Sequence, residues 1–116
     1  MFFKKEEMHI DKIDENSSRE VLAYGEGLMN ARIIFKSGLA EDAPIPLHHH
    51  THVQTTYVLG GAFKFQINYP DHTEIKIVKQ GDAIYFPANY EHGCIPLEDG
   101  SQLFDSFTPI REDFLK

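Results

Sequence analysis

The sequence predicts an all-β protein, either a sandwich or a barrel of short strands. Segments rich in β-branched and aromatic residues recur along the chain, with turn-forming residues between them. Several of these segments alternate apolar and polar side chains, the two-residue period of a strand with one buried face. No amphipathic helix longer than a turn or two is evident. Short strands at this spacing are typical of closed or stacked β-architectures.

Eight segments are expected to form strands. They span residues 20–24, 28–36, 53–59, 62–68, 74–79, 83–86, 92–96 and 102–108. The preceding residues, 1–20, are mixed in charge and weakly periodic, so we expect them to pair as an edge strand or to exchange with a second subunit. Pro44 and Pro46 indicate an extended loop before residue 48, because proline disfavours helix at and just before its own position.

Turn signals suggest how neighbouring strands are joined. Gly60-Gly61 predicts a hairpin between segments 53–59 and 62–68, since glycine accepts the positive φ of tight turns. Residues 69–72, Tyr-Pro-Asp-His, predict the next turn. After it, Ile75 and Ile77 are expected to face the interior and Lys76 to face solvent.

Composition limits the function classes. At 116 residues the chain is expected to be a single domain, residues 1–116. Its formal charge of −7, without a local Lys/Arg cluster, argues against nucleic acid as a partner.

The N-terminus and the single cysteine suggest a compartment. Residues 1–7 lack the apolar region of a signal peptide, and no apolar run is long enough for a membrane span. The lone Cys94 rules out an intrachain disulfide, which agrees with a reducing environment. We therefore expect a cytoplasmic protein that does not engage a membrane.

A histidine-rich run is the strongest chemical signal. Four imidazoles and a carboxamide occur within residues 48–54. In an extended segment, residues two apart share a face, so His48, His50 and Gln54 point one way and His49 the other. His52 shares the first face. Such a local surplus of ligands indicates a metal site.

A second motif, later in the chain, contributes one more imidazole. The two motifs read H-x-H-x3-Q-x6-G and G-x5-P-x4-H, and together they resemble the signatures of the cupin superfamily. Their positions are His48, His50, Gln54 and Gly61, then Gly81, Pro87 and His92. The resemblance implies a small double-stranded β-barrel, or jelly roll, with its metal-binding signatures within residues 44–96. It also implies one divalent metal, Zn, Ni, Fe or Mn, bound by His48, His50, Gln54 and His92.

The departures from the cupin pattern leave the ligand positions intact. Asp42, Asn89 and Pro96 replace residues that are not ligands. Gln54 stands where glutamate is commoner. The amide keeps an oxygen donor but removes a negative charge, which would make a bound ion a stronger Lewis acid.

Further segments resemble a narrower family, the pectin-degradation cupins known as KdgF. They are residues 21–24, 57–61, 91–94 and 107–115. This resemblance implies an enzyme that converts 4,5-unsaturated monouronates, from pectin or alginate lysis, to linear keto uronic acids without redox change. It also implies a homodimer.

Three residues near the C-terminus are the candidate catalytic group. Asp105 shares a strand face with Leu103 and Phe107, and a carboxylate on an apolar stripe must pair, bind something or have a raised pKa. We assign Asp105 to proton transfer; the structural alternative is a carboxylate tied to a backbone or arginine donor. Arg111 could clamp the uronate carboxylate or form a surface ion pair. Phe107 could wall the sugar or belong to the core, and Cys94 is expected to line the pocket.

Two other function classes stay open. A cupin dioxygenase would need Fe or Cu and oxygen. A sugar-binding or sensing module would bind a small-molecule sugar acid without turnover and would act through a partner protein.

Overall fold

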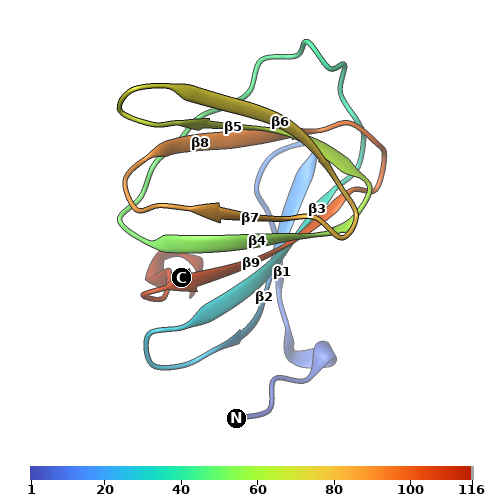
Figure 1. Ribbon diagram of the computed structural model, residues 1–116. Helices are drawn as coiled ribbons and strands as arrows, with labels where there is room; N and C mark the ends of the chain where they lie inside the picture. Colours follow the sequence, from blue (N-terminus) through green and yellow to red (C-terminus); the bar gives the residue numbers. More distant parts are fainter. Residues whose placement is uncertain (116) are drawn as a thin grey trace.

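The computed structural model describes residues 1–115, which form nine β-strands in two sheets (Figure 1). The strands are β1 (Ile10–Lys12), β2 (Ser17–Tyr24), β3 (Met29–Phe35), β4 (Val53–Gly60), β5 (Ala62–Asn68), β6 (Thr73–Lys79), β7 (Ala83–Phe86), β8 (Glu91–Pro96) and β9 (Gln102–Thr108). Two short 3₁₀ turns, η1 (Lys5–Glu7) and η2 (Glu112–Leu115), are the helical elements of these residues. Within residues 1–115, no helix has the length and apolar character needed to cross a membrane.

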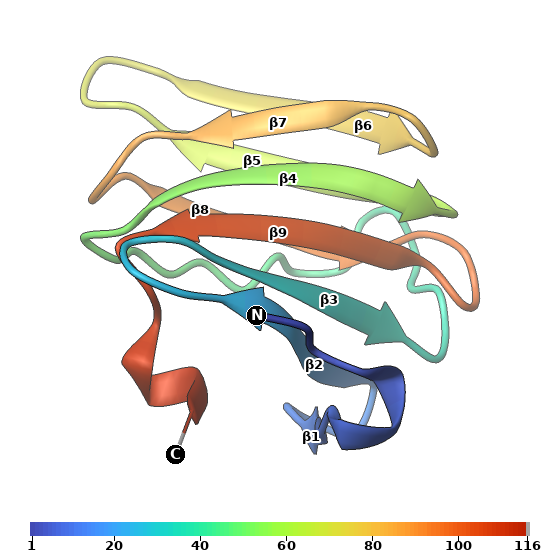
Figure 2. The ribbon, with the colours of Figure 1, turned by 90° about the horizontal axis from the view of Figure 1, so that it is seen from below.

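The sheets are antiparallel and face each other. One has the strand order β1-β2-β3-β9-β4-β7, and the other has the order β6-β5-β8. Figure 2 shows the larger sheet, with β9 between β4 and β3. The all-β fold class is confirmed, and all eight expected segments correspond to β2 through β9. The additional strand, β1, lies at the edge of the larger sheet. Its exchange with a second subunit stays a prediction.

The apolar core lies between the two sheets. Its main cluster consists of Val58, Phe63, Phe65, Ile67, Phe86 and Leu103. A second cluster, Met29, Ala31 and Phe107, is covered by Ile110 and Phe114 from the C-terminal segment. This segment therefore packs against the barrel and contributes side chains to its interior.

The hairpin predicted at Gly60-Gly61 is wrong. β4 pairs with β7 and β9, whereas β5 pairs with β6 and β8, so the two glycines carry the chain from one sheet to the other. Gly61 has φ 76°, and a Cβ there would overlap Ser101. The glycines mark a sharp turn, but a turn signal contains no information about which strands pair afterwards.

The predicted orientation of β6 is also wrong. Ile75 and Ile77 are 51% and 47% exposed. The turn at residues 69–72, which is confirmed, places Asn68 opposite Thr73, and this register pairs the two isoleucines with Gln66 and Lys64 on the outer face of β5. Side-chain parity along β6 is therefore set by the turn and by β5 instead of by apolar character.

Candidate metal centre

Backbone pairing brings the two cupin-like motifs together. His48 donates its N–H to the His92 carbonyl at 3.0 Å, and His92 donates to the His48 carbonyl at 2.8 Å. The next residue on β8, Gly93, allows this approach, because a Cβ there would overlap the carbonyl of Pro46. The proline-marked loop thus lies directly against β8.

Three imidazoles converge at this junction. His48, His50 and His92 each offer a ring nitrogen, and these nitrogens lie within 4.8 Å of one another. The ring of His92 is 4.6 Å from that of His48 and 5.1 Å from that of His50, between centroids. His92 is buried, whereas His48 lies at the exposed rim. The structure therefore brings together all three histidines of the predicted ligand set.

Backbone carbonyls orient two of these rings. His92 Nδ1 lies 3.2 Å from the Tyr90 carbonyl, and its buried Nε2 has no partner among the described residues. His50 Nδ1 lies 2.9 Å from the His52 carbonyl. A neutral imidazole that donates from Nδ1 has a bare lone pair on Nε2, the form that binds metals.

The fourth predicted ligand, Gln54, is buried on β4. Its Nε2 donates to Thr56 Oγ1 at 2.8 Å, which turns the amide oxygen toward His50. Gln54 Oε1 then lies 3.1 Å from His50 Nε2. When His50 donates from Nδ1, both of these atoms are acceptors, and two acceptors at this distance favour a shared cation. The donor set of three imidazoles and an amide oxygen fits a divalent transition metal.

The environment keeps the imidazoles neutral. Burial, followed by the neighbouring His48, lowers the pKa of His92 to about 4. Burial is also the main cause of the lowered pKa of His48 and of His50. At neutral pH these rings therefore offer lone pairs without first releasing a proton.

The two remaining histidines of the run lie outside this group. His52 Nε2 lies 3.1 Å from the carbonyl of Ile110, so this side chain ties the start of β4 to the C-terminal segment. His49 is exposed. Strand parity put His52 on the ligand side, but only the folded C-terminus provides its partner.

Asp105 lies next to the same centre, on β9. It is 7% exposed, and Thr56 Oγ1 donates to its Oδ1 at 2.6 Å. Burial raises the pKa of Asp105 to about 6, although the Thr56 and Gln54 hydrogen bonds oppose this shift. The expected inward stripe of Leu103, Asp105 and Phe107 is confirmed. A threonine hydroxyl takes the place of the backbone or arginine donor considered from the sequence.

Most of these side chains border one cavity of about 320 Å³, although His50 is not among its lining residues. The predicted site residues that line it are His48, Gln54, His92, Asp105, Phe107 and Arg111. Cys94 also lines it, as expected, and burial raises the pKa of its thiol. The Cys94 thiol therefore lines the cavity in its protonated form at neutral pH.

Arg111 enters this cavity from the C-terminal segment. Its Nε and Nη2 donate to the two carboxylate oxygens of Asp113, at 3.1 and 2.9 Å. The guanidinium also lies 4.3 Å from the Phe114 ring centroid. Sequence reasoning missed Asp113, which pairs with Arg111, and the lining residues Phe114 and Arg19. Their signal was weak, because each lies near a chain end and far in sequence from the histidine motifs.

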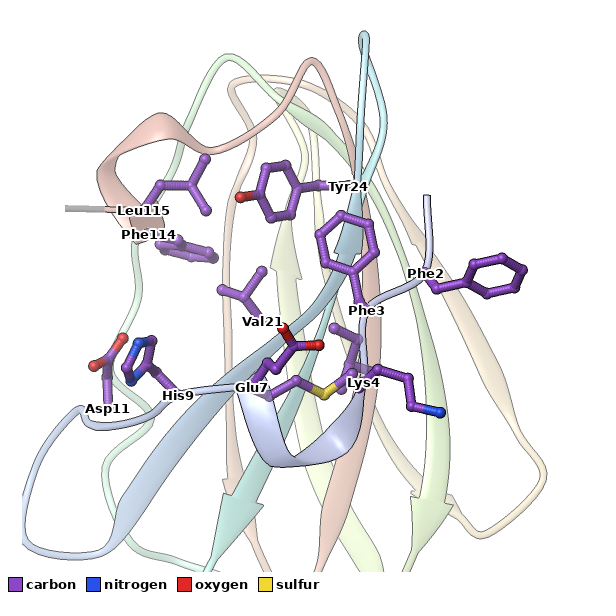
Figure 3. Close-up of a pocket in the computed structure, with 12 residues that line it drawn as sticks. Phe2, Phe3, Lys4, Glu7, His9, Asp11, Val21, Tyr24, Phe114 and Leu115 are labelled. Carbon is purple, nitrogen blue, oxygen red and sulfur yellow. The ribbon is translucent and has the colours of Figure 1, made fainter.

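A second cavity, of about 480 Å³, lies on the other side of Phe114. Figure 3 shows Phe114 and Leu115 of η2 near Val21 and Tyr24 of β2, with Phe3 beside Tyr24. None of the predicted metal or catalytic residues lines this larger cavity. Its mixed rim of Lys4, Glu7, His9 and Asp11 contains no convergent ligand set among the described residues.

Comparison with known proteins identifies the family. Residues 37–102 match the family described as Cupin domain. The chain is also 32% identical over 114 residues to the pectin degradation protein KdgF of Dickeya dadantii (strain 3937). The alignment covers 98% of this chain and 97% of that protein. This chain is a cupin of the KdgF family. The family resemblance seen in the sequence is thereby confirmed.

Two solved structures support the same placement of this cupin. KdgF from Halomonas sp. matches with a TM-score of 0.83 and 30% identity, covering 98% of this chain and 99% of that one. An RmlC-like cupin from Shewanella frigidimarina NCIMB 400 matches with a TM-score of 0.81 and 32% identity, covering 97% and 94%. The match to KdgF is therefore full-length in both sequence and fold.

Proposed function

We propose that this cupin converts 4,5-unsaturated monouronates to linear keto uronic acids in a metal-dependent reaction without redox change. The observation that carries the proposal is the placement of a buried carboxyl, Asp105, beside a convergent set of metal-ligand atoms in one cavity. The likeness to a protein described as acting in pectin degradation supports this substrate class.

The reaction is an isomerisation. The unsaturated ring is a masked enol, so breaking the C1–O5 bond forms an aldehyde at C1 and an enol at C5. The enol becomes a ketone when C4 takes up a proton and O5 gives one up. Overall one proton moves from the O1 hydroxyl to C4, and neither water nor an electron is consumed. A group that exchanges protons near neutral pH is the chief requirement.

Asp105 meets this requirement. Its pKa is about 6 in metal-free protein, and a bound cation would lower this value, so at neutral pH the carboxylate is ionised and can accept a proton and then release it. Thr56 donates to Oδ1, so we assign Oδ2 to the proton exchange. A divalent ion held by the three histidines and Gln54 would supply Lewis acidity to a sugar oxygen when bound.

Two further residues shape the substrate site in this proposal. Phe107 belongs mainly to the second core cluster and is 3% exposed, so it offers the sugar only a small apolar contact at the cavity lining. Arg111 adds positive charge near the reacting atoms, although its Nε and Nη2 already donate to the carboxylate of Asp113. Its role is therefore electrostatic and not that of a free bidentate clamp.

The direct test is turnover of lyase-generated unsaturated monouronate, followed as loss of the C=C absorbance. We expect metal-loaded protein to be active without oxygen and chelated protein to be inactive. Asp105→Asn is expected to retain metal and lose most turnover. A strict oxygen requirement would favour the dioxygenase alternative, and binding without turnover would favour the sensor. Wild-type rates from a metal-loaded Asp105→Asn would refute the proton-transfer role.

A further inference from the structure

Arg19 is a cation of the substrate cavity that forms no ion pair within the described chain. Asp11, opposite it on β1, and Asp113 act on its charge only at longer range. It lies on β2, opposite Ile33 of β3, and both residues line the 320 Å³ cavity. Its Nε is buried and donates to no hydrogen-bond partner within residues 1–115. In the same part of the chain, no carboxylate oxygen lies within 4.0 Å of its guanidinium, whereas Arg32 of β3 pairs with Glu20. A buried arginine nitrogen without a hydrogen-bond partner destabilises the folded protein, and an anionic ligand that pairs with the guanidinium would offset part of this cost.

The guanidinium of Arg19 is held in place by an aromatic ring. Its Cζ lies 3.7 Å from the centroid of Phe114, a stacking distance. Arg111 Cζ lies 4.3 Å from the same ring. Phe114 therefore fixes the position of Arg19. The Nε atom is covered, so the two Nη groups are the donors left for a ligand.

The two arginines differ in what they can still bind. They are the permanently charged cations that line this cavity. The Nε–Nη2 edge of Arg111, which fits a carboxylate bidentately, is occupied by Asp113. Arg19 has no such partner in the described chain, and its Nη groups can bind an anion, although its Nε is covered. For an anionic ligand entering a protein of formal charge −7, Arg19 is thus the available recognition group.

We propose that Arg19 binds the carboxylate of the sugar acid and determines the preference of this cavity for uronates over neutral sugars. The inference rests on the proposed function for the identity of the substrate. It assigns substrate recognition to β2. The metal centre, on the segment before β4, on β4 and on β8, and Asp105 on β9 perform the chemistry. The cavity, of about 320 Å³, is of the size that holds one small ligand.

The first experiment separates binding from catalysis. Metal-loaded Arg19→Met is expected to raise KM for the unsaturated monouronate about 10- to 100-fold, the usual effect of losing a charged hydrogen bond, with kcat and metal content close to wild type. Lys12→Met removes the same charge from the exposed face of the neighbouring strand β1 and should leave KM unchanged. An unchanged KM in metal-loaded Arg19→Met would overturn the proposal.

The second experiment is independent of turnover. Calorimetry compares binding of D-galacturonate and of its uncharged methyl ester to metal-loaded wild type and Arg19→Met. We expect the wild type to prefer the acid at least tenfold and the variant to lose this preference. Arg19→Gln provides the same comparison if the methionine variant does not fold. A preference retained without Arg19, or absent from the wild type, overturns the inference.

The two experiments distinguish failure of this inference from failure of the proposed function. An Arg19-dependent preference for the acid, without turnover of the unsaturated sugar, would refute the proposed reaction and support the role of Arg19. Turnover with an unchanged KM in Arg19→Met would do the reverse.

Discussion

Single hydrogen bonds determine the chemistry of this centre at the scale of residues. Thr56 accepts from Gln54 Nε2 at 2.8 Å and donates to Asp105 Oδ1 at 2.6 Å. One hydroxyl therefore orients a predicted metal ligand and also contacts the predicted proton carrier. No motif includes Thr56, because its role depends on two partners, one of them 49 residues away.

Removing this hydroxyl should weaken metal binding. Thr56→Val is nearly isosteric but cannot accept from Gln54, so the amide loses its fixed orientation. We expect about a tenfold loss of metal affinity, the lower end of what is typical when a residue supporting a metal ligand is removed. Titration of metal-free protein with Zn²⁺ measures the effect. Thr56→Ser keeps the hydroxyl and should retain wild-type affinity; equal affinities in the valine and serine variants would contradict the orienting role.

The raised pKa of Asp105 predicts a pH dependence of stability in metal-free protein. The folded-state pKa of about 6 exceeds the ordinary aspartate value of 3.8, so the native state holds this proton more tightly than the unfolded state. Stability contributed by the protonated carboxyl is present below the unfolded pKa and is lost as pH rises toward the folded pKa. The loss is about 3 kcal/mol at most.

Urea unfolding of wild type and Asp105→Asn, at pH 4 and at pH 7, isolates this effect. Chelator is needed in all samples, because a bound cation would lower the pKa of the carboxyl. The asparagine does not titrate. The free energy of unfolding of Asp105→Asn minus that of wild type should therefore rise by up to about 3 kcal/mol from pH 4 to pH 7. Histidine ionisation is common to both proteins and cancels. If the difference in free energy of unfolding between the two proteins were the same at both pH values, the pKa of Asp105 would not be raised in the folded state.

The connections between strands determine where the ligands meet at the scale of elements. The turn at Gly60-Gly61 sends β5 into the opposite sheet, and β8 then pairs with β5 while its His92 bridges His48. A hairpin at this position would have left β4 and β5 in one sheet. The position of His92 near His48, His50 and Gln54 therefore depends on this crossover.

Gly61→Ala is expected to disrupt the crossover. Its φ of 76° strains any residue with a Cβ, and the added methyl would overlap Ser101. We expect a loss of about 2–3 kcal/mol in the free energy of unfolding, measured with urea. Gly60→Ala is the matched control, because a Cβ there has nothing within 4 Å and this glycine has no positive φ. Equal losses in the two variants would contradict the proposed role of Gly61.

The C-terminal segment connects the elements to the whole molecule. It packs Ile110 and Phe114 against the second core cluster and carries Arg111 into the cavity. Phe114 separates this cavity from the larger one bounded by the N-terminal residues. Both chain ends thus contribute to the surroundings of a centre whose ligands come from the middle of the sequence.

Assembly of the whole molecule stays a prediction. The family resemblance and the exposed edge strands favour a homodimer. Light scattering should then give a mass about twice the chain mass of 13.3 kDa. A mass equal to that of one chain, at the concentrations used for activity, would refute the dimer. Deletion of residues 1–12 tests strand exchange. If the dimer forms by exchange of this arm, the deletion variant should be monomeric, and if the arm stays with its own subunit, the variant should remain dimeric.

The sequence by itself determined the strands, the ligand types and their spacing in this cupin. These properties are local. Spacing grouped His48, His50 and Gln54, although residues 48–52 precede β4 and contain a bend, so strand parity alone does not explain why they meet. The same parity put Asp105 inside. Tertiary structure alone decided the sheet entered after Gly61, the outward face of Ile75 and the stacking of Arg19 and Arg111 on Phe114. Those outcomes depend on contacts between residues far apart in the chain, where local preferences contain no information about which groups will meet.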